Sequence, residues 1–252
     1  MNAAVVSDAE RQVRTDLAAC YRLVAHYGWD DMIFTHISAR VPGTEDQFLI
    51  NPYGMLFEEI TASSLVKVDL AGNKIDQSPF PVNPAGFTIH SAVHQIRHDA
   101  HCVIHLHTVA GTAVATDPRG LLPLNQTALL VREQLAWHEY EGVAVDHDER
   151  PRLQADLGDK ELMLLWNHGT LALGPTIAEA FMRIYFLERA CAMQVATLSA
   201  LGDAVPHPVM DGIESKTAAQ GNHPELSKMM ANQLAWPALK RMLDRRSPGY
   251  PD

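Results

Sequence analysis

The fold is decided by the stretch Cys102-Val103-Ile104-His105-Leu106-His107-Thr108. Apolar and imidazole side chains alternate along it, which is typical of a β-strand whose two faces meet different surroundings. His105 and His107 therefore leave one face together, while Ile104 and Leu106 face the other way. Because one rigid strand aims both imidazoles in the same direction, the stretch predicts a strand that presents two candidate metal ligands.

A third histidine follows another apolar run. A strand predicted from Glu161 to Trp166 ends at Asn167-His168-Gly169, where glycine allows the backbone to turn sharply and present His168 at a sheet edge. Three neutral imidazoles with one open position are a known arrangement for catalytic zinc, and iron and manganese also accept imidazole. Spacing alone leaves two interpretations of His105, His107 and His168, which are a divalent metal site or core histidines with satisfied hydrogen bonds.

A second group of histidines competes for the metal role. His90, His94 and His98 are spaced i, i+4 and i+8, which would stack them along one face of a helix predicted from Phe87 to Ile96. Histidines at that spacing on a helix can also bind a metal ion. Neighbouring positions such as Gln95 are polar, however, so the sequence favours a solvated or packing face without a ligand role.

Further helix and strand signals surround these sites. Ser7 and Glu10 have the spacing of a capping box and open an amphipathic helix that ends near Gly28. Thr176 and Glu179 repeat that spacing before a long helix that runs to about Leu201. We also expect a helix at Thr108–Ala115 and short strands at Ile37–Val41, Phe48–Ile50 and Leu65–Leu70.

Length and composition limit the classes of protein and partner. The 252 residues suit one main domain, which we place at residues 1–205, with a C-terminal extension at residues 206–252 that is rich in Pro, Gly and polar residues. The formal charge of -10 and the lack of a basic run argue against nucleic acid as a partner. We expect neither a membrane span nor export, and therefore a cytoplasmic protein. Cys20, Cys102 and Cys191 suit buried thiols in a reducing compartment.

Several short motifs follow one another in a fixed order. They are Thr35-His36-Ile37-Ser38-Ala39-Arg40, Ile50-Asn51-Pro52-Tyr53-Gly54, Val82 to Ala92, Cys102 to His107, Asn167-His168-Gly169 and the long helix after Thr176. Over about Asp16 to Leu201 this order resembles the class II aldolase/adducin family, and it is closer to the adducin head than to the sugar-phosphate aldolases. The resemblance implies an α/β fold, a three-layer α/β/α domain with a mixed, largely antiparallel central sheet, assembled as a homotetramer.

The resemblance also implies a ligand set. In metal-binding members the His-x-His pair and the histidine of Asn-His-Gly hold the metal, which corresponds to His105, His107 and His168 here. Zinc is then the favoured cofactor, with iron and manganese as alternatives. By the same analogy, His36 and Gly86 are the candidate substrate-binding positions.

Two departures separate the chain from the sugar-phosphate aldolases. The acidic residue that carries a proton in those enzymes corresponds to Gly86. The positions of their phosphate loop correspond to Thr35-His36, Tyr53-Gly54 and Pro84-Ala85, which are not the hydroxyl- and amide-rich sets of the aldolases. A phosphorylated sugar is therefore not the expected substrate.

The implied function is a metal-dependent lyase that cleaves a carbon-carbon bond or decarboxylates through a metal-stabilised enolate. Its expected substrate is a small non-phosphorylated keto, hydroxy or aromatic acid, and its proton carrier stays open among Glu133, Glu139 and Tyr140. A non-haem iron oxygenase and an adducin-like oligomeric binding or scaffold domain without catalysis are the alternatives. We expect a scaffold to need more chain after the head than the residues up to Asp252 provide, and converging imidazoles without a ligand would be costly to bury.

Overall fold

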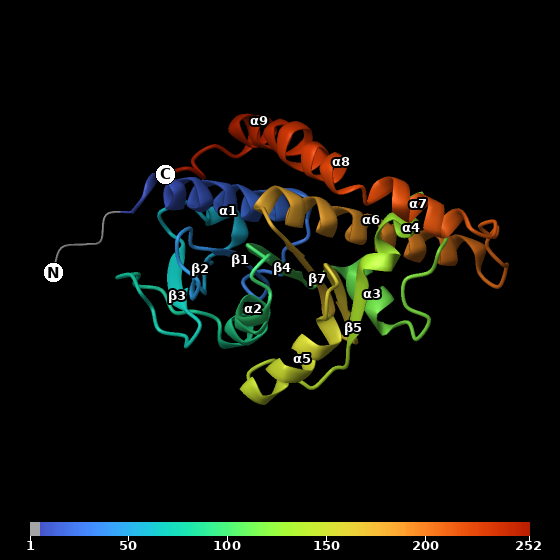
Figure 1. Ribbon diagram of the computed structural model, residues 1–252, viewed down its shortest axis with the longest axis horizontal. Helices are drawn as coiled ribbons and strands as arrows, with labels where there is room; N and C mark the ends of the chain where they lie inside the picture. Colours follow the sequence, from blue (N-terminus) through green and yellow to red (C-terminus); the bar gives the residue numbers. More distant parts are fainter. Residues whose placement is uncertain (1–5) are drawn as a thin grey trace.

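The centre of the fold is a seven-stranded sheet with the order β3-β2-β1-β4-β7-β6-β5 (Figure 1). The structure, a computed structural model, describes residues 6–252. Neighbouring strands are antiparallel except for β5 and β6, which run parallel, so the prediction of a mixed, largely antiparallel sheet is confirmed. The strands are β1 His36–Arg40, β2 Gln47–Ile50, β3 Val66–Asp69, β4 Cys102–Leu106, β5 Leu135–His138, β6 Leu162–Leu165 and β7 Gly169–Gly174.

Helices cover both faces of this sheet and complete the predicted α/β/α layers. On one face α1 and α6 pack over residues such as Ile104, and on the other α2 and α5 pack over residues such as Val103 (Figure 1). Successive side chains of β4 point to opposite faces of the sheet, so Ile104 and Val103 pack in different layers. The helices are α1 Asp8–His26, α2 Pro84–Ile96, α3 Val109–Thr116, α4 Gln126–Val131, α5 Arg150–Leu157, α6 Ile177–Leu201, α7 Ile213–Gly221, α8 Pro224–Met229 and α9 Trp236–Arg246, with 3₁₀ turns at η1 Phe57–Glu59, η2 Arg132–Gln134 and η3 His147–Glu149 and a π-helical turn η4 at Met230–Ala235.

The C-terminal segment returns over the first layer of helices. After α6, the helices α7, α8 and α9 run back along α6 and α1 (Figure 1). Trp236, Leu243 and Tyr250 are buried in the same core cluster as Leu17 of α1. The segment therefore covers apolar surface of the main domain, and the division at residue 205 stays a prediction.

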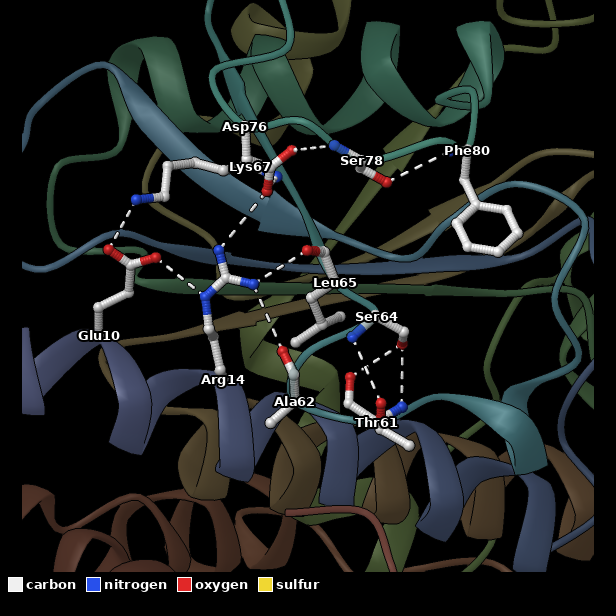
Figure 2. A network of polar contacts seen from close by, with 10 residues as sticks. All are labelled: Glu10, Arg14, Thr61, Ala62, Ser64, Leu65, Lys67, Asp76, Ser78 and Phe80. Atoms are coloured by element: carbon white, nitrogen blue, oxygen red, sulfur yellow. Dashed lines mark hydrogen bonds and ion pairs between the residues drawn. The ribbon is translucent and has the colours of Figure 1, made fainter. Parts of the chain in front are cut away.

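A buried ion network ties α1 to the edge strand β3 (Figure 2). Glu10 accepts hydrogen bonds from Arg14 at 2.9 Å and from Lys67 at 2.7 Å. Burial alone would raise the pKa of Glu10, but the bonds from Lys67 and Arg14 outweigh it and lower the pKa. Arg14 also donates to the backbone carbonyl of Leu65 at 2.9 Å. The network holds the start of α1 against the edge that carries β2 and β3.

Two strands were not predicted from the sequence. The residues Asn167-His168-Gly169 were predicted to be a break, whereas Gly169–Gly174 forms β7, the central partner of β4 and β6. No element was predicted for Leu135–His138, which forms the short edge strand β5 and pairs with β6. Runs of four to six residues carry too little periodicity to be recognised without their partners. Among residues 6–252, no helix combines the length and apolarity that a bilayer crossing requires.

Candidate metal centre

Two neighbouring strands bring the three predicted ligands together. His105 lies near the end of β4 and His107 directly after it, while His168 lies in the tight connection between β6 and β7. Because β7 pairs with both β4 and β6, the turn that carries His168 meets the end of β4. Thr112 of α3 donates a hydrogen bond to the backbone carbonyl of His168 at 3.1 Å, which holds that turn in place.

The three imidazoles converge through their Nε2 atoms. The Nε2–Nε2 distances are 2.9 Å for His105–His107, 3.0 Å for His107–His168 and 3.3 Å for His105–His168. Nitrogen ligands about 2.0–2.1 Å from a zinc ion are about 2.9 Å apart at right angles and about 3.3 Å apart at the tetrahedral angle. The spacing therefore fits three ligands of one ion, and among the described residues this triad is the group found with metal-ligand geometry.

Hydrogen-bond partners at Nδ1, the ring nitrogen away from the point of convergence, fix the tautomers of two ligands. His105 Nδ1 lies 3.0 Å from the carbonyl oxygen of Thr170, and His107 Nδ1 lies 3.1 Å from Oδ2 of Asp31. Both partners accept hydrogen bonds, so the neutral form of either ring carries its hydrogen on Nδ1 and presents a lone pair at Nε2. Two lone pairs 2.9 Å apart repel each other unless a positive charge lies between them. This donor set suits a divalent cation, and metal-binding histidines commonly have such partners.

Burial keeps two of the ligands, His105 and His168, in the form that binds metal. Burial and the neighbouring imidazoles lower the pKa of His105, and burial lowers the pKa of His168 to about 4. Both rings are therefore neutral at neutral pH, and a neutral imidazole is the form that a metal ion requires.

Gly169 has a different role from the one that the sequence suggested. The residue with left-handed backbone in the turn is Asn167, with φ of +55°, and Gly169 needs no such conformation. A Cβ atom on Gly169 would lie 2.3 Å from the carbonyl oxygen of Leu106 and 3.1 Å from Cδ2 of His107. Gly169 therefore allows the close approach of β7 to the end of β4, and Asn167 makes the turn.

The rival histidines do not form a stacked set. His90 and His94 lie on α2 and are fully buried, whereas His98 lies beyond the end of α2 and is exposed. His90 is within hydrogen-bond distance of His36, and Ser38 lies within hydrogen-bond distance of both helical imidazoles. The face is a packing face with its own polar contacts, as the sequence favoured.

The two candidate substrate-binding positions lie beside the triad and beside each other. The ring centre of His36 is 5.0 Å from that of His105, its partner across β1 and β4. A Cβ atom on Gly86 would lie 2.6 Å from Cδ2 of His36. The imidazole of His36 therefore occupies the space into which a side chain at position 86 would project.

The three proton-carrier candidates are placed differently. The ring centre of Tyr140 lies 6.2 Å from that of His168. Glu133 lies in η2, at the start of β5 and thus at the opposite end of the sheet from the turn that carries His168. Glu139 is exposed. Of the three, Tyr140 is the one for which the structure shows a contact with the triad.

Two supporting residues were not found from the sequence. Asp31 is 76 positions from its partner His107, in the loop after α1, and no spacing pattern connects the two. Glu188 of α6 accepts hydrogen bonds from Thr108, which directly follows His107, and from Thr170 of β7, which is two residues after His168. The apolar residues around Glu188 recur at helical spacing in the sequence. That pattern predicts a buried helix face, but it does not predict that the carboxyl group of Glu188 is buried.

Glu188 should make stability depend on pH. Burial raises its pKa from the ordinary 4.5 to about 7, although both threonine hydroxyls act to lower it. The folded state thus binds this proton more tightly than the unfolded state, so the stabilisation is complete below about pH 4.5 and is lost as the pH rises through 7. Glu188→Gln, which does not titrate, should gain about 3 kcal/mol over the natural chain between pH 4.5 and 8.

Urea unfolding of both chains, stripped of metal with a chelator, measures this gain. If the free energies of unfolding of Glu188→Gln and the natural chain differ by the same amount throughout that pH range, Glu188 ionises as an exposed carboxyl does.

Comparison with known proteins identifies the family. The model of the Class II Aldolase and Adducin N-terminal domain matches residues 15–195, which include the triad, His36 and Gly86. The chain belongs to this family of α/β proteins.

Individual relatives agree with this assignment. A Caulobacter vibrioides protein, whose name assigns it only provisionally to the class 2 aldolases, is 58% identical over 250 residues, 98% of this chain and 95% of that protein. Alpha-adducin of Rattus norvegicus is 40% identical over 254 residues, 96% of this chain but 34% of the adducin. The crystal structure of an aldolase II superfamily protein from Pseudomonas syringae has a TM-score of 0.88 at 45% identity and covers 98% of both chains.

Proposed function

We propose that this chain is a cytoplasmic metal-dependent lyase that holds one divalent ion, preferably zinc, on His105, His107 and His168. The observation that carries the proposal is the convergence of the Nε2 atoms of the three imidazoles, 2.9 Å apart for His105 and His107 and 3.0 Å apart for His107 and His168. Iron and manganese are the alternative ions. A bound ion would supply Lewis-acid stabilisation of negative charge on a substrate oxygen.

The other residues of the site would act on the substrate directly. His36 offers an imidazole edge beside the triad, and Tyr140 places a phenol near His168. Tyr140 is 52% exposed, so its hydroxyl has room to approach a bound molecule and to give or take a proton. A small keto, hydroxy or aromatic acid without phosphate suits this donor set, because its oxygens could meet both the ion and the side chains of His36 and Tyr140.

Metal analysis tests this proposal. Protein purified without chelators should contain about one divalent ion per chain, and added zinc, iron or manganese should raise the unfolding temperature of the stripped protein. Aerobic and anaerobic screens of keto and aromatic acids then separate lyase from oxygenase chemistry. If no preparation contains metal and no added ion raises the unfolding temperature, the adducin-like binding function replaces the enzyme.

Sugar-phosphate cleavage should be absent even from the fully metallated protein. Gly86 has no group that can carry a proton, and the ring of His36 fills the space beside it. We expect fuculose 1-phosphate and rhamnulose 1-phosphate to be cleaved no faster than in buffer, as measured by release of dihydroxyacetone phosphate. Cleavage well above that background would show that neither departure matters.

We also propose that the chain assembles as a homotetramer, as the family resemblance implies. Light scattering at micromolar concentration should give four times the chain mass of 27.8 kDa. A mass equal to that of one chain would contradict the tetramer.

A further inference from the structure

The carboxyl of Glu188 joins the two segments that carry the ligands. Its Oε2 accepts a hydrogen bond from the hydroxyl of Thr108, the residue directly after His107, and its Oε1 accepts one from the hydroxyl of Thr170 at 2.5 Å. Thr170 lies in β7, which pairs with β4. One side chain of α6 therefore bridges the end of β4 and the start of β7, with one carboxyl oxygen for each segment.

Both threonines are in turn connected to the metal centre or to the elements around it. The carbonyl oxygen of Thr170 lies 3.0 Å from Nδ1 of His105, so the residue that bonds Glu188 also supports a ligand. The hydroxyl of Thr108 accepts a hydrogen bond from the backbone N–H of Gly111 at 2.9 Å, at the start of α3. A Cβ atom on Gly111 would lie 3.2 Å from Oε1 of Glu188, so α3 packs directly against the carboxyl. A displacement of this carboxyl would therefore be transmitted to both segments of the triad.

A carboxyl is a costly group at this position. Glu188 is 3% exposed, and Ile184 and Cys191, one turn away on the same face of α6, are fully buried. Among the described residues no cation acts on this carboxyl, because burial and the two threonine hydroxyls are the causes that set its pKa. An apolar side chain would fill the same face without the cost of desolvating a carboxyl, but it could not bond two hydroxyls. The two hydrogen bonds are therefore the property that distinguishes Glu188 from an apolar residue.

We propose that Glu188 is a positioning residue of the metal centre, whose carboxyl holds Thr108 and Thr170 at a fixed separation and thereby sets the geometry in which the three triad imidazoles receive the ion. The inference rests on the proposed function, because it takes the triad as the metal site. The hydrogen bonds of Glu188 go to the threonines and not to the imidazoles, so it acts on the ion through other residues. Ligands that are held in place by such partners bind their metal more tightly.

Zinc affinity of the full chain is the first test, measured by competition with a coloured chelator. Glu188→Ala should weaken zinc binding about 10- to 100-fold, as removal of a supporting partner does. Glu188→Gln should keep most of the affinity, because its Oε1 can accept from one threonine and its amide nitrogen can donate to the other. If Glu188→Gln loses as much affinity as Glu188→Ala, the charge acts rather than the two hydrogen bonds, and the positioning role is contradicted.

A matched control comes from the same helix. Gln194 of α6 is as buried as Glu188, and it accepts a hydrogen bond from the backbone N–H of Leu122 at 2.7 Å and donates to the carbonyl of Gly120 at 2.9 Å. Gln194→Ala therefore also removes a buried polar side chain with two partners, but away from the ligand segments. It should lower the free energy of unfolding while zinc affinity stays unchanged.

The visible spectrum of the cobalt-substituted protein is the second test, because it responds to the arrangement of the ligands and not to the stability of the chain. Glu188→Ala should shift the bands of bound cobalt, whereas Glu188→Gln and Gln194→Ala should leave them in place. A shift in Gln194→Ala equal to that in Glu188→Ala would show that any loss of packing on α6 disturbs the site, and would overturn a specific role for Glu188.

Thr170→Val provides the third test, since valine has the shape of threonine without the hydroxyl. This change should weaken zinc binding by about tenfold alone and cause no further loss in the Glu188→Ala background, because both changes break the same bridge. Losses that simply add would contradict the bridge. If Glu188→Ala does not fold, Thr170→Val decides alone, and unchanged zinc affinity in it overturns the proposal.

The outcomes separate the two proposals. Full zinc affinity and an unchanged cobalt spectrum in Glu188→Ala overturn the positioning role alone. A natural chain that takes up neither zinc nor cobalt overturns the proposed function, and the positioning role with it.

Discussion

His105→Ala, His107→Ala and His168→Ala should each lose bound divalent metal. The three Nε2 atoms lie within 3.3 Å of one another, so removal of one leaves two nitrogens, which is fewer than catalytic zinc sites contain. The loss should exceed the 10- to 100-fold that removal of a supporting partner costs. Elemental analysis after dialysis and competition with a coloured chelator measure it.

Two further variants serve as comparisons for metal binding. Asp31→Asn should cause a partial loss of affinity, and His98→Ala should cause none. Asp31 supports His107 without contacting the ion, so its replacement should weaken metal binding by about 10- to 100-fold. His98 is exposed and lies beyond the end of α2, so its replacement should leave the metal unchanged. If His94→Ala empties the site while the three triad variants keep their metal, the ligands belong to the rival cluster.

Gly169→Ala should be the most damaging of the single-methyl changes at this site. The added Cβ would lie 2.3 Å from the carbonyl oxygen of Leu106, and backbone of a central strand pair cannot move aside as a flexible side chain can. We expect a loss of about 3 kcal/mol or more in the free energy of unfolding, at the upper end for an overpacked core. Separation of β7 from β4 would also move the carbonyl of Thr170 away from His105 and weaken metal binding.

Urea unfolding of the metal-stripped proteins measures the stability loss without the contribution of metal binding. Gly43→Ala is the control, since Gly43 has φ of +80° and no atom within 4 Å of the added Cβ. That change should cost only about 1–2 kcal/mol, from the left-handed backbone. A smaller loss in Gly169→Ala than in Gly43→Ala would contradict the close-approach role of Gly169.

The sequence by itself determined the family, the layers and the composition of the triad. Alternation along β4 placed Ile104 and Val103 in opposite layers and gave His105 and His107 a common direction. Capping residues set the starts of α1 and α6, where Ser7 and Thr176 bond to the backbone as expected. The common direction of the two imidazoles and the helix starts could be predicted because periodicity and capping are local properties of the chain. The family and the three layers followed from the resemblance that several short motifs in a fixed order carry.

Only the tertiary structure decided which distant residues complete the site. Asp31 reaches His107, Glu188 reaches Thr108 and His90 reaches His36, each across long stretches of chain. It also showed that Gly86 makes room for the imidazole of His36. Such contacts depend on strand pairing and helix packing, which bring residues together regardless of their separation in sequence, so no local pattern records them.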